Sequence, residues 1–258
     1  MKNKSTLKTI VMFLFGSTLL MSIALAFKSC NQTEQIEIDM AEVQLVQLDD
    51  VQEGEPIAII KTNLGEIRAV LYPEEAPKTV ENFVALAESG YYDGTYIYKV
   101  EPNICFSAGS KDEDGLENVD VEAENHKAPV EMSANLWPFR GAFCTLTFQE
   151  EQSFWEKLRG KTTNYTSSKF IVINSINMDE ETKTALLEAN KSDELANAFI
   201  EKGGIPNFSQ MYPIFAQTYE GFDVIDKITD VEINLEEKNN KPKEDIIIES
   251  IEISTYAK

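Results

Sequence analysis

Residues 72–100 read YPEEAPKTVENFVALAESGYYDGTYIYKV, and this stretch decides the fold. Pro77 can begin a helix, because the first helical position needs no backbone N–H donor. Gly90 can end that helix, because glycine readily takes the backbone conformation that follows a last helical turn. Apolar residues recur between them at helical spacing, namely Val80, Phe83, Val84 and Ala87. We therefore predict a helix with one apolar face that packs on a core.

Predicted strands lie on both sides of this helix. Residues 57–61 and 66–71 flank a short turn and form a hairpin. Residues 96–100 and 104–109 are the next strand candidates. A further helix is expected over residues 179–202, which are rich in Glu, Lys, Ala and Leu and are followed by two glycines.

The order of these motifs resembles that of the cyclophilin-type peptidyl-prolyl isomerases, over about residues 56–254. Later segments that fit the family are residues 139–143, 167–172, 214–228 and the strand around 245–253. Within the opening stretch the matching residues are Pro73, Pro77, Thr79, Val80, Asn82, Phe83, Gly90, Tyr91, Tyr92, Asp93, Gly94 and Thr95.

The resemblance implies a mostly β fold with flanking helices. We expect a closed antiparallel eight-stranded barrel, capped by two helices and carrying one extra inserted helix. The domain is expected to span residues 56–258, with insertions near 148–166 and 176–204.

The resemblance also implies the chemistry of Xaa-Pro bond rotation, whose barrier is about 20 kcal/mol. Such an isomerase needs no metal or cofactor. It needs an apolar slot for the proline ring and a hydrogen-bond donor near the prolyl nitrogen, where the donor stabilises the twisted transition state. The family uses an arginine as this donor, and Lys99 occupies its position here.

Other positions of the peptide groove also depart from the family pattern, and Asn207 stands where the family has a tryptophan. The resemblance implies that ten residues contact the substrate: Tyr98, Ile104, Ser107, Leu146, Thr147, Lys169, Phe170, Ile171, Phe208 and Tyr212. Two hypotheses follow. The first is an isomerase weakened by the substitutions, with Lys99 as the donor. The second is a cyclophilin-like module that binds peptides or a partner protein without useful turnover.

The N-terminus predicts export. Three lysines in the first eight residues precede an uncharged run over residues 10–27. Three outcomes are open for this run. A signal peptidase could cleave after Ala24-Leu25-Ala26, the run could stay as a membrane anchor, or the protein could be attached to the membrane by a lipid on Cys30. Residues 1–30 are thus a signal peptide or anchor, and the acidic residues 31–55 are expected to be a tether. The lysines favour the extracytoplasmic face of the cell membrane, with secretion as the alternative.

The formal charge of −21 argues against nucleic-acid binding, because phosphates would be repelled. The expected partners are proline-containing segments of exported or unfolded proteins, and the expected state is a monomer. Asp112, Asp114 and the sole histidine, His126, lack the spacing of a metal site. Cys105 and Cys144 lie in apolar strands and are expected to be buried, and a disulfide between them remains open.

Overall fold

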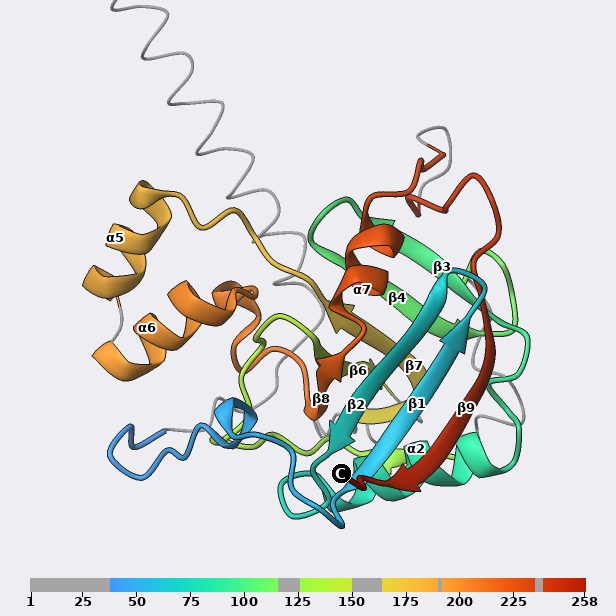
Figure 1. Ribbon diagram of the computed structural model, residues 1–258, viewed down its shortest axis with the longest axis horizontal. Helices are drawn as coiled ribbons and strands as arrows, with labels where there is room; N and C mark the ends of the chain where they lie inside the picture. The colour runs from blue at the N-terminus through green and yellow to red at the C-terminus, as the bar shows by residue number, and fades with distance from the viewer. Residues whose placement is uncertain (1–37, 116–125, 150–163, 190–191, 235–238) are drawn as a thin grey trace, which may run out of the picture. The chain divides into compact units, whose positions relative to one another are not determined.

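The computed structural model describes residues 38–115, 126–149, 164–189, 192–234 and 239–258 (Figure 1). The chain divides into two units, residues 1–35 and 36–258, and the described residues all belong to the second. The apolar run 10–27, Cys30 and most of the insertion 148–166 lie outside them. Within the described ranges, no helix has the length and apolar character needed to cross a bilayer.

The described strands form one antiparallel sheet in the order β4-β3-β9-β1-β2-β8-β6-β7-β5. A further pairing between β4 and β7 closes the first eight of these into the predicted barrel, and β5 adds two residues beside β7. The strand bounds are β1 Pro56–Thr62, β2 Gly65–Leu71, β3 Thr95–Glu101, β4 Cys105–Ser110, β5 Ala128–Pro129, β6 Ala142–Gln149, β7 Asn164–Ile173, β8 Ile214–Glu220 and β9 Ile247–Thr255.

The stretch that decides the fold forms the predicted helix and the strand after it, and strand β2 ends directly before it. Helix α2 spans Pro77–Glu88, with Pro77 in its first turn, and Gly90 follows with φ of +72°. The carboxylate of Glu131 accepts hydrogen bonds from the backbone N–H and the hydroxyl of Thr79, at 2.8 and 2.9 Å. An anionic acceptor is favourable at this end of a helix, so Glu131 stabilises the start of α2 from 52 residues away.

Helix α2 contributes its apolar face to the main core of the barrel. The ring of Phe83 lies between those of Tyr92, Phe170 and Phe215, with centroid distances of 5.4, 5.9 and 5.0 Å. Helix α7, Phe222–Thr229, adds Val224, Ile225 and Ile228 to the same cluster. Figure 1 shows α2 at the foot of the strands and α7 nearer their other end.

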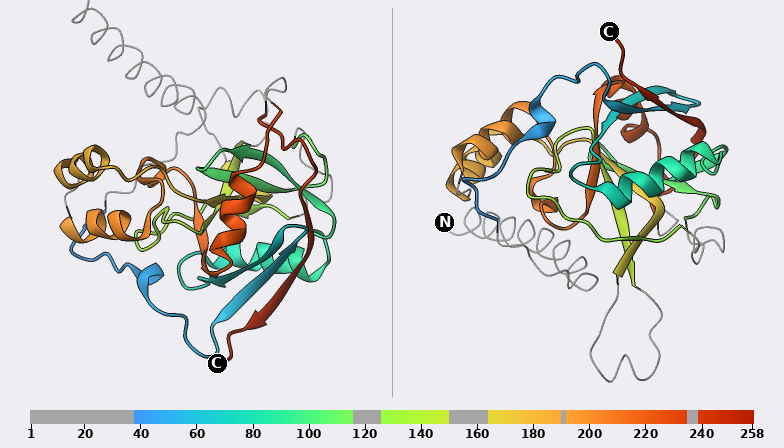
Figure 2. Two further views of the ribbon diagram at one scale, coloured as in Figure 1. Left: turned by 45° about the horizontal axis from the view of Figure 1, so that its top comes forward. Right: turned by 90° about the horizontal axis from the view of Figure 1, so that it is seen from below.

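The segment expected to be one helix over residues 179–202 is instead two. Helix α5 spans Glu180–Ala189 and helix α6 spans Asp193–Lys202. Ser192 has an extended backbone, and its hydroxyl accepts a hydrogen bond from the N–H of Leu195. A serine followed by two acidic residues favours a new helix start over continuation, which explains the break. The two helices project from one side of the barrel (Figures 1 and 2).

Residues 38–55, the described part of the expected tether, lie against the domain, and we call them the N-terminal strap. Strap residues Ile38, Met40, Val43, Leu45 and Leu48 pack on a cluster formed by Trp137, Phe139, Leu195, Ala198 and Phe199. A short 3₁₀ helix, η1 (Val46–Leu48), carries Gln47, whose side chain is buried. The strap is therefore part of the folded unit from Ile38 onward.

Candidate functional site

Strand register brings several of the predicted site residues onto one face of the barrel. Lys99 on β3 is paired with Ser107 on β4, and Ser107 is paired with Ile171 on β7. Ile171 is in turn paired with Cys144 on β6. Directly paired residues of antiparallel strands project to the same side of a sheet, so these four form one row across four strands.

An apolar cluster continues this row, and we call it the groove cluster. Its buried members are Cys105, Leu136, Ala142, Cys144, Ile171, Ile173, Ile205 and Ile214, with half-buried Leu146, Phe208 and Tyr212 among the residues packed against them. Four of the predicted substrate-binding residues are thus gathered here: Leu146, Ile171, Phe208 and Tyr212. The 3₁₀ helix η2 (Pro206–Phe208) presents Phe208, whose ring lies 5.1 Å from that of Tyr212. The fold thus brings these four residues together, and their contact with a substrate stays a prediction.

Lys99 lies at the β3 end of the row with its ammonium partly exposed to solvent. Its Nζ atom lies 3.0 Å from Oε1 of Glu101, and the two side chains are 36% and 37% exposed. Glu101 was not among the sequence-predicted site residues. The sequence could have indicated Glu101, because it follows Lys99 by two residues at the end of a predicted strand and residues two apart on a strand project to the same face. Ile104, in the turn before β4, is 37% exposed and is one of two large exposed apolar residues found in the described ranges.

Tyr98 and Lys169 are covered by a neighbouring segment. A register shift between Ile97 and Lys99 places Tyr98 in a bulge, and burial raises the pKa of its phenol to about 12. The Nζ atom of Lys169 donates to the carbonyl of Gly115 at 2.9 Å and lies 5.6 Å from the centre of the Tyr98 ring. A Cβ atom on Gly115 would stand 2.0 Å from that ring, so only glycine allows this close approach.

Phe170 and Thr147 differ in environment from the other predicted contacts. Phe170 lies inside the barrel among Phe83, Tyr92 and Phe143, so the structure assigns it to the core and not to the groove. It alternates with Lys169 and Ile171 along β7, and this alternation turns it inward. Thr147 lies beyond a register shift in β6, and its hydroxyl is buried without a hydrogen-bond partner among the described residues.

Both described cysteines are free thiols within the groove cluster, so the disulfide left open by the sequence is not formed. Burial raises the pKa of the Cys105 thiol to about 12 and that of the Cys144 thiol further still. The thiols therefore contribute to packing as small apolar groups.

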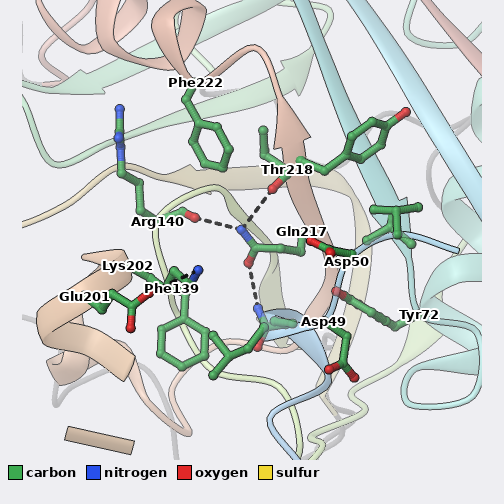
Figure 3. Close-up of a pocket in the computed structure, with 15 residues that line it drawn as sticks. Asp49, Asp50, Tyr72, Phe139, Arg140, Glu201, Lys202, Gln217, Thr218 and Phe222 are labelled. Carbon is green, nitrogen blue, oxygen red and sulfur yellow. Dashed lines mark hydrogen bonds and ion pairs between the residues drawn. The ribbon is translucent and has the colours of Figure 1, made fainter. Parts of the chain in front are cut away.

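A cavity of about 330 Å³ lies between the strap, the end of α6 and the outer side of β8 (Figure 3). At its wall Gln217 donates to the carbonyl oxygens of Arg140 and Thr218 and accepts a hydrogen bond from Gln47. A second cavity of similar volume adjoins the hairpin residues Asn63 and Leu64. Neither cavity is lined by Lys99 or by any of the ten predicted contact residues, so both are separate from the predicted groove.

The closed barrel with this row of residues defines a cyclophilin fold, and comparison with known proteins identifies the family. The family model described as cyclophilin type peptidyl-prolyl cis-trans isomerase/CLD matches residues 57–253. The chain therefore belongs to the cyclophilin-type peptidyl-prolyl isomerase family.

Curated relatives agree with this assignment. A Streptococcus pyogenes protein named "Putative bifunctional phosphatase/peptidyl-prolyl cis-trans isomerase" is 32% identical over 222 residues, which cover 85% of this chain and 43% of that protein. The chain thus spans less than half the length of this relative. A Staphylococcus aureus protein named "Putative peptidyl-prolyl cis-trans isomerase" is 28% identical over 204 residues, which cover 79% of this chain and 94% of that protein.

Solved structures support the fold. The crystal structure of a Cryptosporidium parvum cyclophilin type peptidyl-prolyl cis-trans isomerase is similar with a TM-score of 0.56 and 20% identity, covering 79% of this chain and 99% of that one. A second structure of that protein, obtained in the presence of the dipeptide Ala-Pro, has a TM-score of 0.55.

Proposed function

We propose that this protein is a peptidyl-prolyl cis-trans isomerase that assists the folding of exported proteins, with Lys99 as the electrophilic donor. The observation that carries the proposal is the row on which Lys99 adjoins Ser107 and the groove cluster. A proline ring placed on the groove cluster would lie beside a cation on the neighbouring strand. Such a cation stabilises the twisted amide more than the planar one, and this difference is what lowers the barrier.

The substitutions in the groove support a reduced rate. An ammonium is a point charge, whereas an arginine can hold a carbonyl and approach the prolyl nitrogen with one planar fork. The ammonium of Lys99 also forms an ion pair with the carboxylate of Glu101 at 3.0 Å, and this carboxylate offsets part of the positive charge that would act on the substrate. Lys169 and Tyr98 are nearly buried, so they contribute little surface to a peptide.

The proposed site of action is the extracytoplasmic face of the cell membrane, where the protein works as a monomer attached through its N-terminal segment. Lysines before the apolar run 10–27 support this orientation. Mass spectrometry of the mature N-terminus would reveal cleavage after Ala26 or a lipid on Cys30. Cleavage with no lipid would instead make the protein secreted.

Turnover on a short Ala-Pro peptide, measured by exchange NMR, tests the catalytic assignment. Lys99→Met should abolish turnover, a loss of about a hundredfold or more for removal of a transition-state donor. Lys99→Arg should raise it. A matched control is Lys61→Met, because Lys61 is also a strand lysine in an exposed ion pair, with Glu252 at 3.6 Å. Turnover by Lys99→Met equal to that of the unchanged protein would contradict the mechanism.

A peptide-binding module without turnover is the second candidate function. It is favoured by the half-buried apolar side chains of Leu146, Phe208 and Tyr212 on the groove cluster, because such side chains can hold a peptide without any catalytic donor. Peptide binding in a titration, with no acceleration of isomerisation, is the result that this candidate predicts.

A further inference from the structure

The carboxylate of Glu101 is held at both of its oxygens. Oε1 lies 3.0 Å from the ammonium of Lys99, and Oε2 accepts a hydrogen bond from the side-chain amide of Asn240 at 3.0 Å. A carboxylate fixed on one side by a neutral amide has a defined orientation for the cation on its other side. Asn240, Glu101 and Lys99 therefore form a chain of contacts that ends at the proposed donor.

Asn240 is itself fixed to β3. Its carbonyl oxygen accepts a hydrogen bond from the N–H of Val100 at 3.1 Å, next to the residue that its side chain holds. Asn240 has a positive φ of +49°, which asparagine tolerates better than most residues. These two contacts set the position of the Glu101 carboxylate relative to the strand.

The strand register places this chain of contacts beside the groove cluster. Lys99 is paired with Ser107, whereas Glu101 is paired with Cys105, which belongs to the groove cluster. Ser107 is itself paired with Ile171 of the same cluster, so the attraction of Glu101 holds the Lys99 ammonium on the β3 edge of the groove cluster. A lysine has a long side chain with large rotamer freedom, so an unrestrained ammonium would spend little time in one place.

We propose that Glu101 is a positioning residue, held by Asn240, that keeps the Lys99 ammonium beside the groove cluster for the isomerisation. This inference rests on the proposed function, in which Lys99 is the donor. In this role Glu101 acts on the transition state through Lys99, which its carboxylate contacts at 3.0 Å. Its removal should lower kcat and leave KM unchanged.

The test compares Glu101→Ala with the unchanged full chain in exchange NMR on an Ala-Pro peptide. We expect kcat to fall on the order of fivefold, the effect of losing one partly exposed ion pair. Asn240→Ala should lower kcat in the same direction by a smaller factor. The ¹⁵Nζ signal of Lys99 should lose intensity in both variants, because its ammonium then exchanges faster with water.

The chain offers a closely matched control. Glu66 pairs with Arg68 two residues along β2 at 2.7 Å, and their side chains are 37% and 38% exposed, nearly the same as the Glu101 pair. Glu66→Ala removes a similar strand ion pair outside the row, leaves Arg68 its second contact with Glu220 at 3.7 Å, and should leave kcat unchanged. Equal melting temperatures for the two variants would show that the fall in kcat is not a loss of fold.

The outcomes separate this inference from the proposed function. A kcat for Glu101→Ala that is unchanged or higher, or that falls no more than that of Glu66→Ala, overturns the positioning role. The proposed function survives in that case, provided that Lys99→Met still abolishes turnover. Full turnover by Lys99→Met overturns the donor assignment and this inference with it.

Discussion

The N-terminal strap is expected to be a major source of stability, and Gln47 is the residue that tests this. Its side-chain amide donates to the carbonyl of Trp137 and to Oε1 of Gln217, both at 2.9 Å. Its carbonyl oxygen accepts a hydrogen bond from the N–H of Trp137 at 2.6 Å. The substitution Gln47→Met keeps a similar length and volume but removes all three hydrogen bonds.

The expected cost follows from these contacts. A hydrogen bond contributes about 1 kcal/mol to folding, and a buried group left unpaired can cost more. The carbonyl of Trp137 keeps a hydrogen bond from the N–H of Phe139, whereas the N–H of Trp137 and Oε1 of Gln217 lose the partner that Gln47 supplies. Three lost bonds, with these two buried groups left without that partner, give a loss of about 3 kcal/mol in the free energy of unfolding. For a domain of this size that corresponds to a melting temperature lower by about 6 to 12 °C.

Urea unfolding followed by tryptophan fluorescence measures this loss. Gln52→Met is the control, because Gln52 lies in the same strap but is exposed, and its substitution should change stability by no more than about 0.5 kcal/mol. A loss below about 1 kcal/mol for Gln47→Met would refute the reasoning, since it would mean that the strap is not docked through Gln47 in solution.

Two further predictions concern the barrel. Phe83→Ala should lower the free energy of unfolding by about 3 to 5 kcal/mol, because it leaves a cavity between three aromatic rings. Urea unfolding measures this loss, and a clearly smaller value would mean that α2 is loosely packed. Cys105 should resist iodoacetamide at pH 8 in the folded protein, because a pKa of about 12 leaves roughly one thiol in ten thousand ionised, and should react after unfolding. Rapid labelling of Cys105 in the native state, detected by peptide mass spectrometry, would contradict this.

Much of the barrel could be predicted from local pattern. Proline, glycine and helical spacing fix α2, and the strand before it and the strand after it lie where the sequence predicts them. These signals act within a few residues of chain, so they can be read without a structure. The break between α5 and α6 also has a local cause, in Ser192 and the acids after it, but the high helix propensity of the segment obscured it.

The site was predictable only in part, because its contacts join distant segments. The resemblance named Lys99, Ile171 and Leu146 as site residues, but it could not reveal that Gly115 covers Tyr98 and Lys169. Asn240 approaches Glu101 from 139 residues further along the chain, and no periodicity signals such an approach. Phe170 was predicted as a substrate contact but lies in the core, because it alternates with Lys169 and Ile171 along β7 and faces the opposite side of the strand.

The packing of the strap on α6 sets a limit on how the molecule can be shortened. The family likeness begins at residue 57, yet the apolar faces of Leu195 and Phe199 are covered from residues 38–48. A shortened protein that begins at residue 56 would retain every barrel strand. It would nevertheless expose the apolar surface of Leu195 and Phe199 to water, and this exposed surface would favour self-association. The folded unit therefore begins before residue 57, where the family match begins. A shortened protein should either keep both the strap and helices α5 and α6 or lack both.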